Sequence, residues 1–284
     1  STIIKDAQRH GLKIKPIDVA VSQWPCTLEP GEPSSAARFR AATVRERSVP
    51  SLRLGLGYVK GLREQAGRAI VRERAEGPFA SIDELARRVP DLRADEMNRL
   101  AEIGALNSLG AGHRRDALWQ AARAARPAGP LLERLPDNLA ASPLAPMTPE
   151  ERLVADYRGV ELTLGRHPMA FRRAELDRLG VIRAADLAAI RNGRKVRVAG
   201  CVIVRQRPGT AKGFLFLSLE DETGISNIIV TPDLFESNRR ALVDEPFLLI
   251  DGDLQNQDNA VSVKARRIQP LVATSAQPAS HDFH

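Results

Sequence analysis

The segment Lys195–Arg207 (KVRVAGCVIVRQR) constrains the fold more than any other part of this chain. Apolar and basic residues alternate along it with a period of two, which is the pattern of a β-strand with one face on a core and the other in solvent. The apolar face comprises Val196, Val198, Val202 and Val204. The other face comprises Lys195, Arg197, Arg205 and Arg207. Such a strand predicts a sheet that packs on a hydrophobic core and faces an anionic partner.

The residues after this strand predict a small β-barrel. Strands are expected at 195–206, 213–220 and 225–231, a helix at 232–243, and strands at 246–254 and 259–268. Three strands, a helix and two strands is the order of elements in the OB fold, a five-stranded barrel. Its second and third strands and two of its loops form the ligand face.

The predicted second strand of the barrel offers a surface for stacking bases. Leu215, Leu217 and Leu219 alternate with Phe214 and Phe216, so the two rings lie on the outer face if the leucines face the core. The cations expected beside the rings are Arg205, Arg207 and Lys212. Each base stacked on such a ring contributes roughly 1–3 kcal/mol. The alternative is that both rings pack beneath a neighbouring helix or the linker.

A compact helical region is expected between Leu52 and Leu109. Its first part resembles a helix-hairpin-helix motif, in which the second helix presents unpaired N–H groups and its positive dipole end to a DNA phosphate. The positions that fit the motif are Leu56, Val59, Gly61, Leu62, Ile70 and Val71, whereas Arg63 replaces the usual second glycine and Gly67 replaces an alanine. The residues expected to bind DNA are Lys60, Gly61, Leu62, Arg63 and Arg68. The alternative is an ordinary helical core without a ligand.

Capping signals and periodicity place the other elements. Ser81–Glu84 and Thr148–Glu151 are capping boxes at the start of helices. Further helices are expected at 3–10, 94–103, 113–126, 169–179 and 184–190, and a strand is expected at 13–21. The chain is therefore expected to be a multi-domain α + β protein, with a helical helix-hairpin-helix domain followed by a five-stranded OB-fold β-barrel.

Composition limits the possible partners and chemistry. The net charge of +7 lies in residues 1–127, which hold 22 Lys and Arg against 15 Asp and Glu, and a basic domain of this kind favours a polyanion partner. No run of eighteen apolar residues predicts a membrane span. Two cysteines, Cys26 and Cys201, indicate neither a disulfide framework nor a zinc site and fit a reducing cytoplasm. No metal site, cofactor loop or catalytic group is evident.

The order of motifs resembles the C-terminal portion of bacterial C-family DNA polymerases, and within them the error-prone, damage-inducible ImuC branch. The segments that carry the resemblance are DAQRHGLKIKPIDV (6–19), LRLGLGYVKGLREQAGRAIV (52–71), GPFASIDELARR (77–88), LAEIGALNSLG (100–110), LTLGRHPM (162–169), VRVAGCVIVRQRPGTAKGFLFLSLEDETG (196–224) and SHDFH (280–284). The resemblance implies the following organisation: the end of a fingers-type region at 1–50, a tandem helix-hairpin-helix domain at 51–127, a linker with short helices at 128–193, an OB domain at 194–272 and a flexible tail at 273–284.

The resemblance also implies function. The parent protein would be a DNA-directed DNA polymerase whose palm aspartates hold two metal ions, Mg²⁺, upstream of Ser1, so we expect this chain to be a fragment without catalytic residues. The helical domain would grip duplex primer-template and the OB domain single-stranded template. Expected partners are an ImuB-like inactive Y-family polymerase and an ImuA-type accessory protein. The sliding clamp would bind only indirectly, because no clamp-binding peptide is evident between Trp119 and Met147.

Two alternatives remain open. In the first, the OB domain and tail form a protein-interaction module, with His281, Asp282, Phe283 and His284 as a docking peptide. DNA ligases and tRNA synthetases also contain OB folds, but their domain order and motifs differ from those of this chain.

Overall fold

The computed structural model describes residues 2–30, 50–124, 142–257, 260–271 and 281–283. The chain divides into two compact units, Ser1–Leu164 and Gly165–His284, and each is considered by itself. Both cysteines, Cys26 and Cys201, are free.

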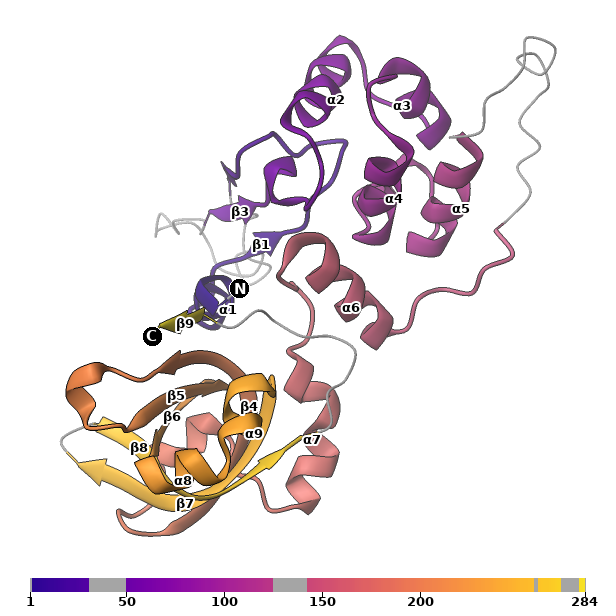
Figure 1. Cartoon of the computed structure of the whole chain (residues 1–284). Coiled ribbons are helices and arrows are strands. Elements are labelled where there is room, and N and C mark those ends of the chain that lie inside the picture. Colours follow the sequence, from indigo (N-terminus) through magenta and orange to yellow (C-terminus); the bar gives the residue numbers. More distant parts are fainter. Residues whose placement is uncertain (1, 31–49, 125–141, 258–259, 272–280, 284) are drawn as a thin grey trace, which may run out of the picture. The chain divides into compact units, whose positions relative to one another are not determined.

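The first unit is built mainly from helices (Figure 1). These are α1 (Thr2–Arg9), α2 (Glu64–Glu76), α3 (Ile82–Arg88), α4 (Ala94–Glu102), α5 (Arg114–Ala124) and α6 (Pro149–Val160). A small sheet joins them, with β3 (Ser51–Arg53) between the parallel β1 (Ile14–Lys15) and the antiparallel β2 (Thr27–Glu29). The expected strand at 13–21 is therefore mostly wrong. Pro16 lacks an N–H, and the carbonyl of Asp18 accepts the N–H groups of Val21 and Ser22, which closes a turn.

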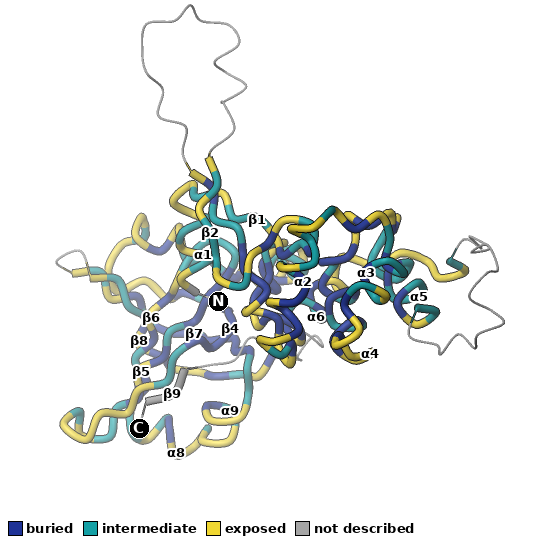
Figure 2. The backbone as a smooth tube through the Cα atoms, turned by 90° about the horizontal axis from the view of Figure 1, so that it is seen from above, coloured by how far each residue is buried: buried dark blue, intermediate teal, exposed yellow. Residues whose placement is uncertain are grey.

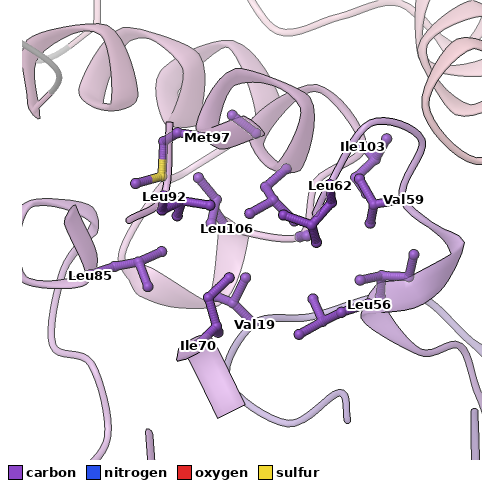
Figure 3. Close-up of a cluster of buried hydrophobic side chains, with 14 of the residues drawn as sticks. Val19, Leu56, Val59, Leu62, Ile70, Leu85, Leu92, Met97, Ile103 and Leu106 are labelled. Atoms are coloured by element: carbon purple, nitrogen blue, oxygen red, sulfur yellow. The ribbon is translucent and has the colours of Figure 1, made fainter. Parts of the chain in front are cut away.

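One hydrophobic core unites the elements of the first unit. Figure 3 shows buried side chains from the 3₁₀ turn Leu56–Tyr58, from α2, α3 and α4, and from the connecting segments. Val59 and Leu62 lie in this core on either side of the hairpin. The predicted capping box at Thr148 is present: Thr148 Oγ1 accepts the Glu151 N–H at 3.2 Å, and the Glu151 carboxylate accepts the Thr148 N–H at 2.8 Å. At Ser81 only half of the predicted box forms: Ser81 Oγ accepts the Glu84 N–H at 3.1 Å, but the Glu84 carboxylate accepts the N–H of Ala80 at 2.7 Å. Helix propensity, caps and apolar periodicity thus agree in this region.

The two helices of the expected linker belong to different units. In α6, the Gly159 carbonyl accepts the Lys60 N–H at 2.7 Å, and Asp156 pairs with Arg114 of α5 at 2.7 Å. Helix α7 (Pro168–Arg178) instead packs on the barrel through Met169 and Leu176. Of the expected 128–193 segment, residues 128–141 lie outside the described part of the chain.

The second unit is a closed barrel (Figure 1). Its strands are β4 (Lys195–Gln206), β5 (Leu215–Glu220), β6 (Ile225–Val230), β7 (Phe247–Gln257) and β8 (Ala260–Pro270). They pair in the order β5-β6-β8-β7-β4, and the β4–β5 pairing closes the ring. Two short helices, α8 (Pro232–Ser237) and α9 (Arg239–Asp244), lie between β6 and β7. These bounds confirm the five predicted strands and the OB-fold order of elements.

Two hydrophobic clusters cover the two faces of the barrel sheet. The interior cluster contains Val196, Val198 and Val202, whereas Cys201 and Ile203 face outward with α7. Strands β4 and β7 are accordingly mostly dark blue in Figure 2. Strand β4 therefore contributes side chains both to the barrel core and to the cluster between the barrel and α7.

A β-bulge in β4 breaks the alternation that the sequence predicted. Val202 lies opposite Leu219 and Val204 lies opposite Ser218, so Ile203 is the extra residue. Beyond the bulge, each side chain of β4 therefore points to the side of the sheet opposite to the one that the sequence alternation predicts. Val204 packs against the outer cluster instead of the barrel interior, and Arg205 lies opposite the interior residue Leu217.

Candidate nucleic-acid interface

The hairpin at 59–63 needs only one glycine. Gly61 has φ +74°, a left-handed conformation that glycine adopts at little cost. Arg63, at the usual second glycine position, is the N-cap of α2 with φ −69° and ψ 142°, which any residue can adopt. The hairpin is therefore formed despite the arginine, and its tip at Lys60 and Gly61 is exposed.

Gly67 is required by Trp24, a residue outside the predicted helix-hairpin-helix motif. A Cβ at Gly67 would lie 2.4 Å from the ring of Trp24, and a Cβ at Gly57 would lie 3.2 Å from the same ring. Trp24 thus packs between the 3₁₀ turn and α2. No local pattern predicts this contact, because Trp24 lies more than thirty residues before the hairpin.

The N-terminus of α2 leaves backbone donors open. No side chain caps this helix, and the N–H groups of its first turn, at Glu64, Gln65 and Ala66, have no acceptor within the helix. Glu64 and Gln65 are exposed. The N–H of Leu62 donates to Val59 and that of Arg63 donates to Glu96. The donors available to an anion are therefore those of the first turn of α2.

Each cation expected at the hairpin has an acidic partner. Lys60 pairs with Glu161, and Arg68 pairs with Glu64 at 2.7 Å; both pairs are exposed. Exposed pairs of this kind contribute only about 0–1 kcal/mol, so a phosphate can replace either carboxylate. Arg63 differs, because its partner is buried. The Arg63 guanidinium is paired with the buried carboxylate of Glu96.

Glu96 of α4 links the N-terminus of α2 to the N-terminus of its own helix. Its carboxylate accepts the Arg63 N–H, the Arg63 guanidinium and the Arg93 N–H, each at 2.9 Å, while its side chain is only 1% exposed. Burial acts to raise the pKa of Glu96, but these hydrogen bonds outweigh it and hold the pKa at about 2. The carboxylate therefore stays ionised and fixes the N-termini of α2 and α4 to each other.

The barrel presents one of the two predicted rings to solvent. Leu215, Leu217 and Leu219 are buried, as predicted, and Phe216 is 37% exposed on the opposite face. It lies opposite Ile229 of β6. Phe214 precedes β5 and is half-buried. Lys212 is exposed in the same loop, with φ 48°.

Arg205 and Arg207 have partners in the short helices between β6 and β7. Because of the bulge, Arg205 turns toward the end of α9 and donates at 2.7 Å to the carbonyls of Leu242 and Glu245. Arg207 lies 4.2 Å from the centre of the Phe235 ring and pairs with Glu236 of α8. Both arginines therefore hold the short helices against the barrel.

Lys195 and Arg197 keep their predicted outward positions. Lys195 is exposed at the start of β4. Arg197 pairs with Asp251 of β7 at 2.6 Å and donates to the Leu179 carbonyl at 2.9 Å. The predicted cationic face is thus divided between the two ends of β4.

The end of the expected flexible tail forms a strand. Residues His281–Phe283 are β9, which pairs in parallel with β4 at 204–206. These three residues add to the edge of β4 that β7 leaves at Cys201. Residues 273–280 and His284 lie outside the described part.

Metal and membrane sites are not found in the described residues. Within them, no group of three or more His, Cys, Asp and Glu could hold a metal ion. No helix in the same residues has the length and apolar character needed to cross a membrane.

The fold and the site agree with comparisons to known protein families. Residues 11–117 match a family model described as a helix-hairpin-helix motif, and residues 196–271 match one described as an OB-fold nucleic acid binding domain. The chain therefore contains a region that matches the helix-hairpin-helix model and a barrel that matches the OB-fold model.

Its relatives are error-prone DNA polymerases. The chain is 43% identical to the error-prone DNA polymerase of Burkholderia pseudomallei, over 99% of this chain and 26% of that protein. It is 42% identical to those of Aromatoleum aromaticum and Methylococcus capsulatus, over 94% and 95% of this chain and 24% and 26% of theirs. The chain is similar to one part of these polymerases and spans about a quarter of the length of the curated relatives it matches. Among solved structures, asparaginyl-tRNA synthetase from Pyrococcus horikoshii is similar at 20% identity with a TM-score of 0.29, over 35% of this chain and 24% of that one.

Proposed function

We propose that this chain is the nucleic-acid-binding C-terminal module of an error-prone, translesion DNA polymerase. Its hairpin would hold duplex primer-template and its barrel single-stranded template. The observation that carries the proposal is the open N-terminus of α2 behind the exposed Gly61 turn. Backbone N–H groups and the helix dipole bind a phosphate there without reading its base.

The hairpin would bind duplex through an exchange of ion pairs. A phosphate that approaches the N–H groups of α2 displaces Glu161 from Lys60 and Glu64 from Arg68. The Arg63–Glu96 pair stays intact and keeps the donors in place. Because every contact is to the backbone, binding would depend on salt and not on sequence.

The barrel would bind single strands at the ring of Phe216. The exposed side chain lies on the second strand of an OB fold, where ligands usually bind. The half-buried ring of Phe214 and the exposed amine of Lys212 extend this surface. Stacking on an aromatic ring accepts any base, as a polymerase template requires.

Nucleotidyl transfer is assigned to other parts of the parent polymerase. Its palm aspartates would hold two Mg²⁺ ions that stabilise the attacking and leaving oxygens. The described residues of this chain contain no cluster that fits such ions, so none of them is given a catalytic role. The parent protein would work in the cytoplasm with an ImuB-like polymerase and an ImuA-type accessory protein, and reach the clamp through them.

A second candidate function is docking of protein partners at the barrel edge. The observation that favours it is β9, which shows that β4 accepts an added strand at 204–206. A partner could pair there by the same backbone hydrogen bonds. If the tail takes part, deletion of residues 275–284 would reduce co-purification with an ImuB-like partner. Full retention of the partner would exclude the tail.

The proposal is tested by the salt dependence of DNA binding. Fluorescence anisotropy would measure the affinity for a primer-template between 50 and 200 mM salt. Six phosphate contacts predict a loss of about a thousandfold over this range. Absence of binding to any DNA at 50 mM salt would refute the proposal.

A further inference from the structure

One row of paired residues runs around the outside of the barrel from Phe216. The strand register joins Phe216 to Ile229, Ile229 to Lys264, Lys264 to Asp253 and Asp253 to Lys195. Directly paired residues face the same side of a sheet. Neighbouring strands lie about 4.8 Å apart, so four steps cover about 19 Å along the curved surface. The exposed ring and the start of β4 are therefore the two ends of a single outer path.

The far end of this path is strongly basic. We define the basic patch as Lys195, Arg197, Lys264, Arg266 and Arg267 on β4 and β8. Two carboxylates lie on the neighbouring face of β7, and each is already paired: Asp251 with Arg197, and Asp253 with Arg266. The remaining three cations are exposed, and within the described part of the chain they have no ion-pair partner. The patch thus carries an excess of three positive charges.

Two open cavities adjoin this patch. One, of about 410 Å³, is lined by Lys195, Arg197 and Arg266 together with Gly180 and Gly252. The other, of about 520 Å³, lies beside α8 and is lined by Lys264 and Arg266 together with the carboxylates of Asp233 and Asp253. Arg266 lines both cavities, so they are neighbours. Each is large enough for a phosphodiester group, and their walls offer guanidinium and ammonium donors.

We propose that the basic patch is a second contact for single-stranded nucleic acid, continuous with the ring of Phe216. The inference rests on the proposed function of the barrel and deepens it. A strand whose base stacks on Phe216 runs across β6 and β8, and its phosphates lie at the patch. This route differs from the one predicted by the sequence, because Arg205 and Arg207 hold α8 and α9.

The length of the bound oligonucleotide tests this route. The full 284-residue chain would be titrated against oligothymidylates of four and twelve nucleotides by fluorescence anisotropy. The patch variant is Lys195→Gln, Lys264→Gln and Arg267→Gln, which removes the three unpaired cations and orphans no carboxylate. The matched control is Arg178→Gln, Arg239→Gln and Arg240→Gln, which removes the same charge from exposed positions of the same unit. Melting curves establish that both variants are folded.

We expect the patch variant to bind the twelve-nucleotide probe at least tenfold more weakly than the control, while binding of the four-nucleotide probe stays within twofold. The salt slope of the longer probe should fall by about two, because each contact on a single strand contributes about 0.7. Equal behaviour of the two variants overturns the route while leaving the role of Phe216 standing. Absence of binding by the wild type overturns both. Loss of polyglutamate binding in the patch variant, with the twelve-nucleotide affinity kept, also overturns the inference and assigns the patch to an acidic protein.

Discussion

Arg63 and Glu96 form the ion pair on which the geometry of the hairpin depends. The guanidinium and the N–H of Arg63 both donate to one buried carboxylate at 2.9 Å, and the same carboxylate accepts the N–H of Arg93. An arginine in the place of the second hairpin glycine therefore gives rigidity to the site.

Removal of the Glu96 charge should destabilise the first unit. In Glu96→Gln the guanidinium loses its charged partner, and breaking such a buried pair costs about 3 kcal/mol. Urea unfolding measures the loss. The matched control is Glu64→Gln, which breaks the exposed pair with Arg68 and should change stability by less than about 1 kcal/mol. Equal losses in the two variants would contradict the assigned role of Glu96.

The same carboxylate predicts an acid-sensitive fold. The pKa of Glu96 is about 2 in the folded chain and 4.5 as its ordinary value. A group with a lowered folded pKa stabilises fully above its unfolded pKa, so this contribution is complete above pH 4.5 and disappears as the pH falls toward 2. Wild type should lose stability across that window by more than Glu96→Gln does. If the free energies of unfolding of wild type and Glu96→Gln changed in parallel with pH, the assigned role of the Arg63–Glu96 pair would be contradicted.

Gly67 should not tolerate even one methyl group. In Gly67→Ala the new Cβ meets the Trp24 ring at 2.4 Å, so the chain must shift and we expect a loss of about 1–3 kcal/mol. Gly77→Ala, at the end of the same helix, meets nothing within 4 Å and serves as the control. Thermal melts compare the two. Combining Gly67→Ala with Trp24→Leu should recover part of the loss, and strict additivity would contradict the contact.

Phe216 should act on single strands alone. Phe216→Ala removes one stacking platform, which predicts a loss of about 1–3 kcal/mol for oligothymidylate and no change for duplex. Val243→Ala removes an exposed apolar side chain from α9 and is the control. Fluorescence anisotropy would measure the affinity of each variant for oligothymidylate and for duplex DNA. A Phe216→Ala protein that binds single strands normally would remove the ring from the site.

The sequence predicts the helices and strands of this chain better than it predicts which acidic residue pairs with each cation. The strands of the barrel and the capped helices follow from periodicity and caps, which are properties of neighbouring residues. The bulge at Ile203 is not visible in the alternation, and it redirects Arg205. Lys60 meets Glu161 and Arg63 meets Glu96, far along the chain. Only the tertiary fold determines such pairs, so a cationic pattern indicated a basic surface but not which cations are available.

The most direct test of the account removes one backbone donor from the N-terminus of α2. Glu64 is the first residue of this helix, where proline fits, and Arg63 before it already has the extended backbone that a following proline requires. Glu64→Ala keeps the N–H and loses the acidic side chain, so it is the matched control for Glu64→Pro. We predict that Glu64→Pro binds duplex primer-template about tenfold or more weakly than Glu64→Ala, since a hydrogen bond to a charged group contributes about 1.5–3 kcal/mol. Equal duplex affinities of the two folded variants would contradict phosphate binding at the hairpin.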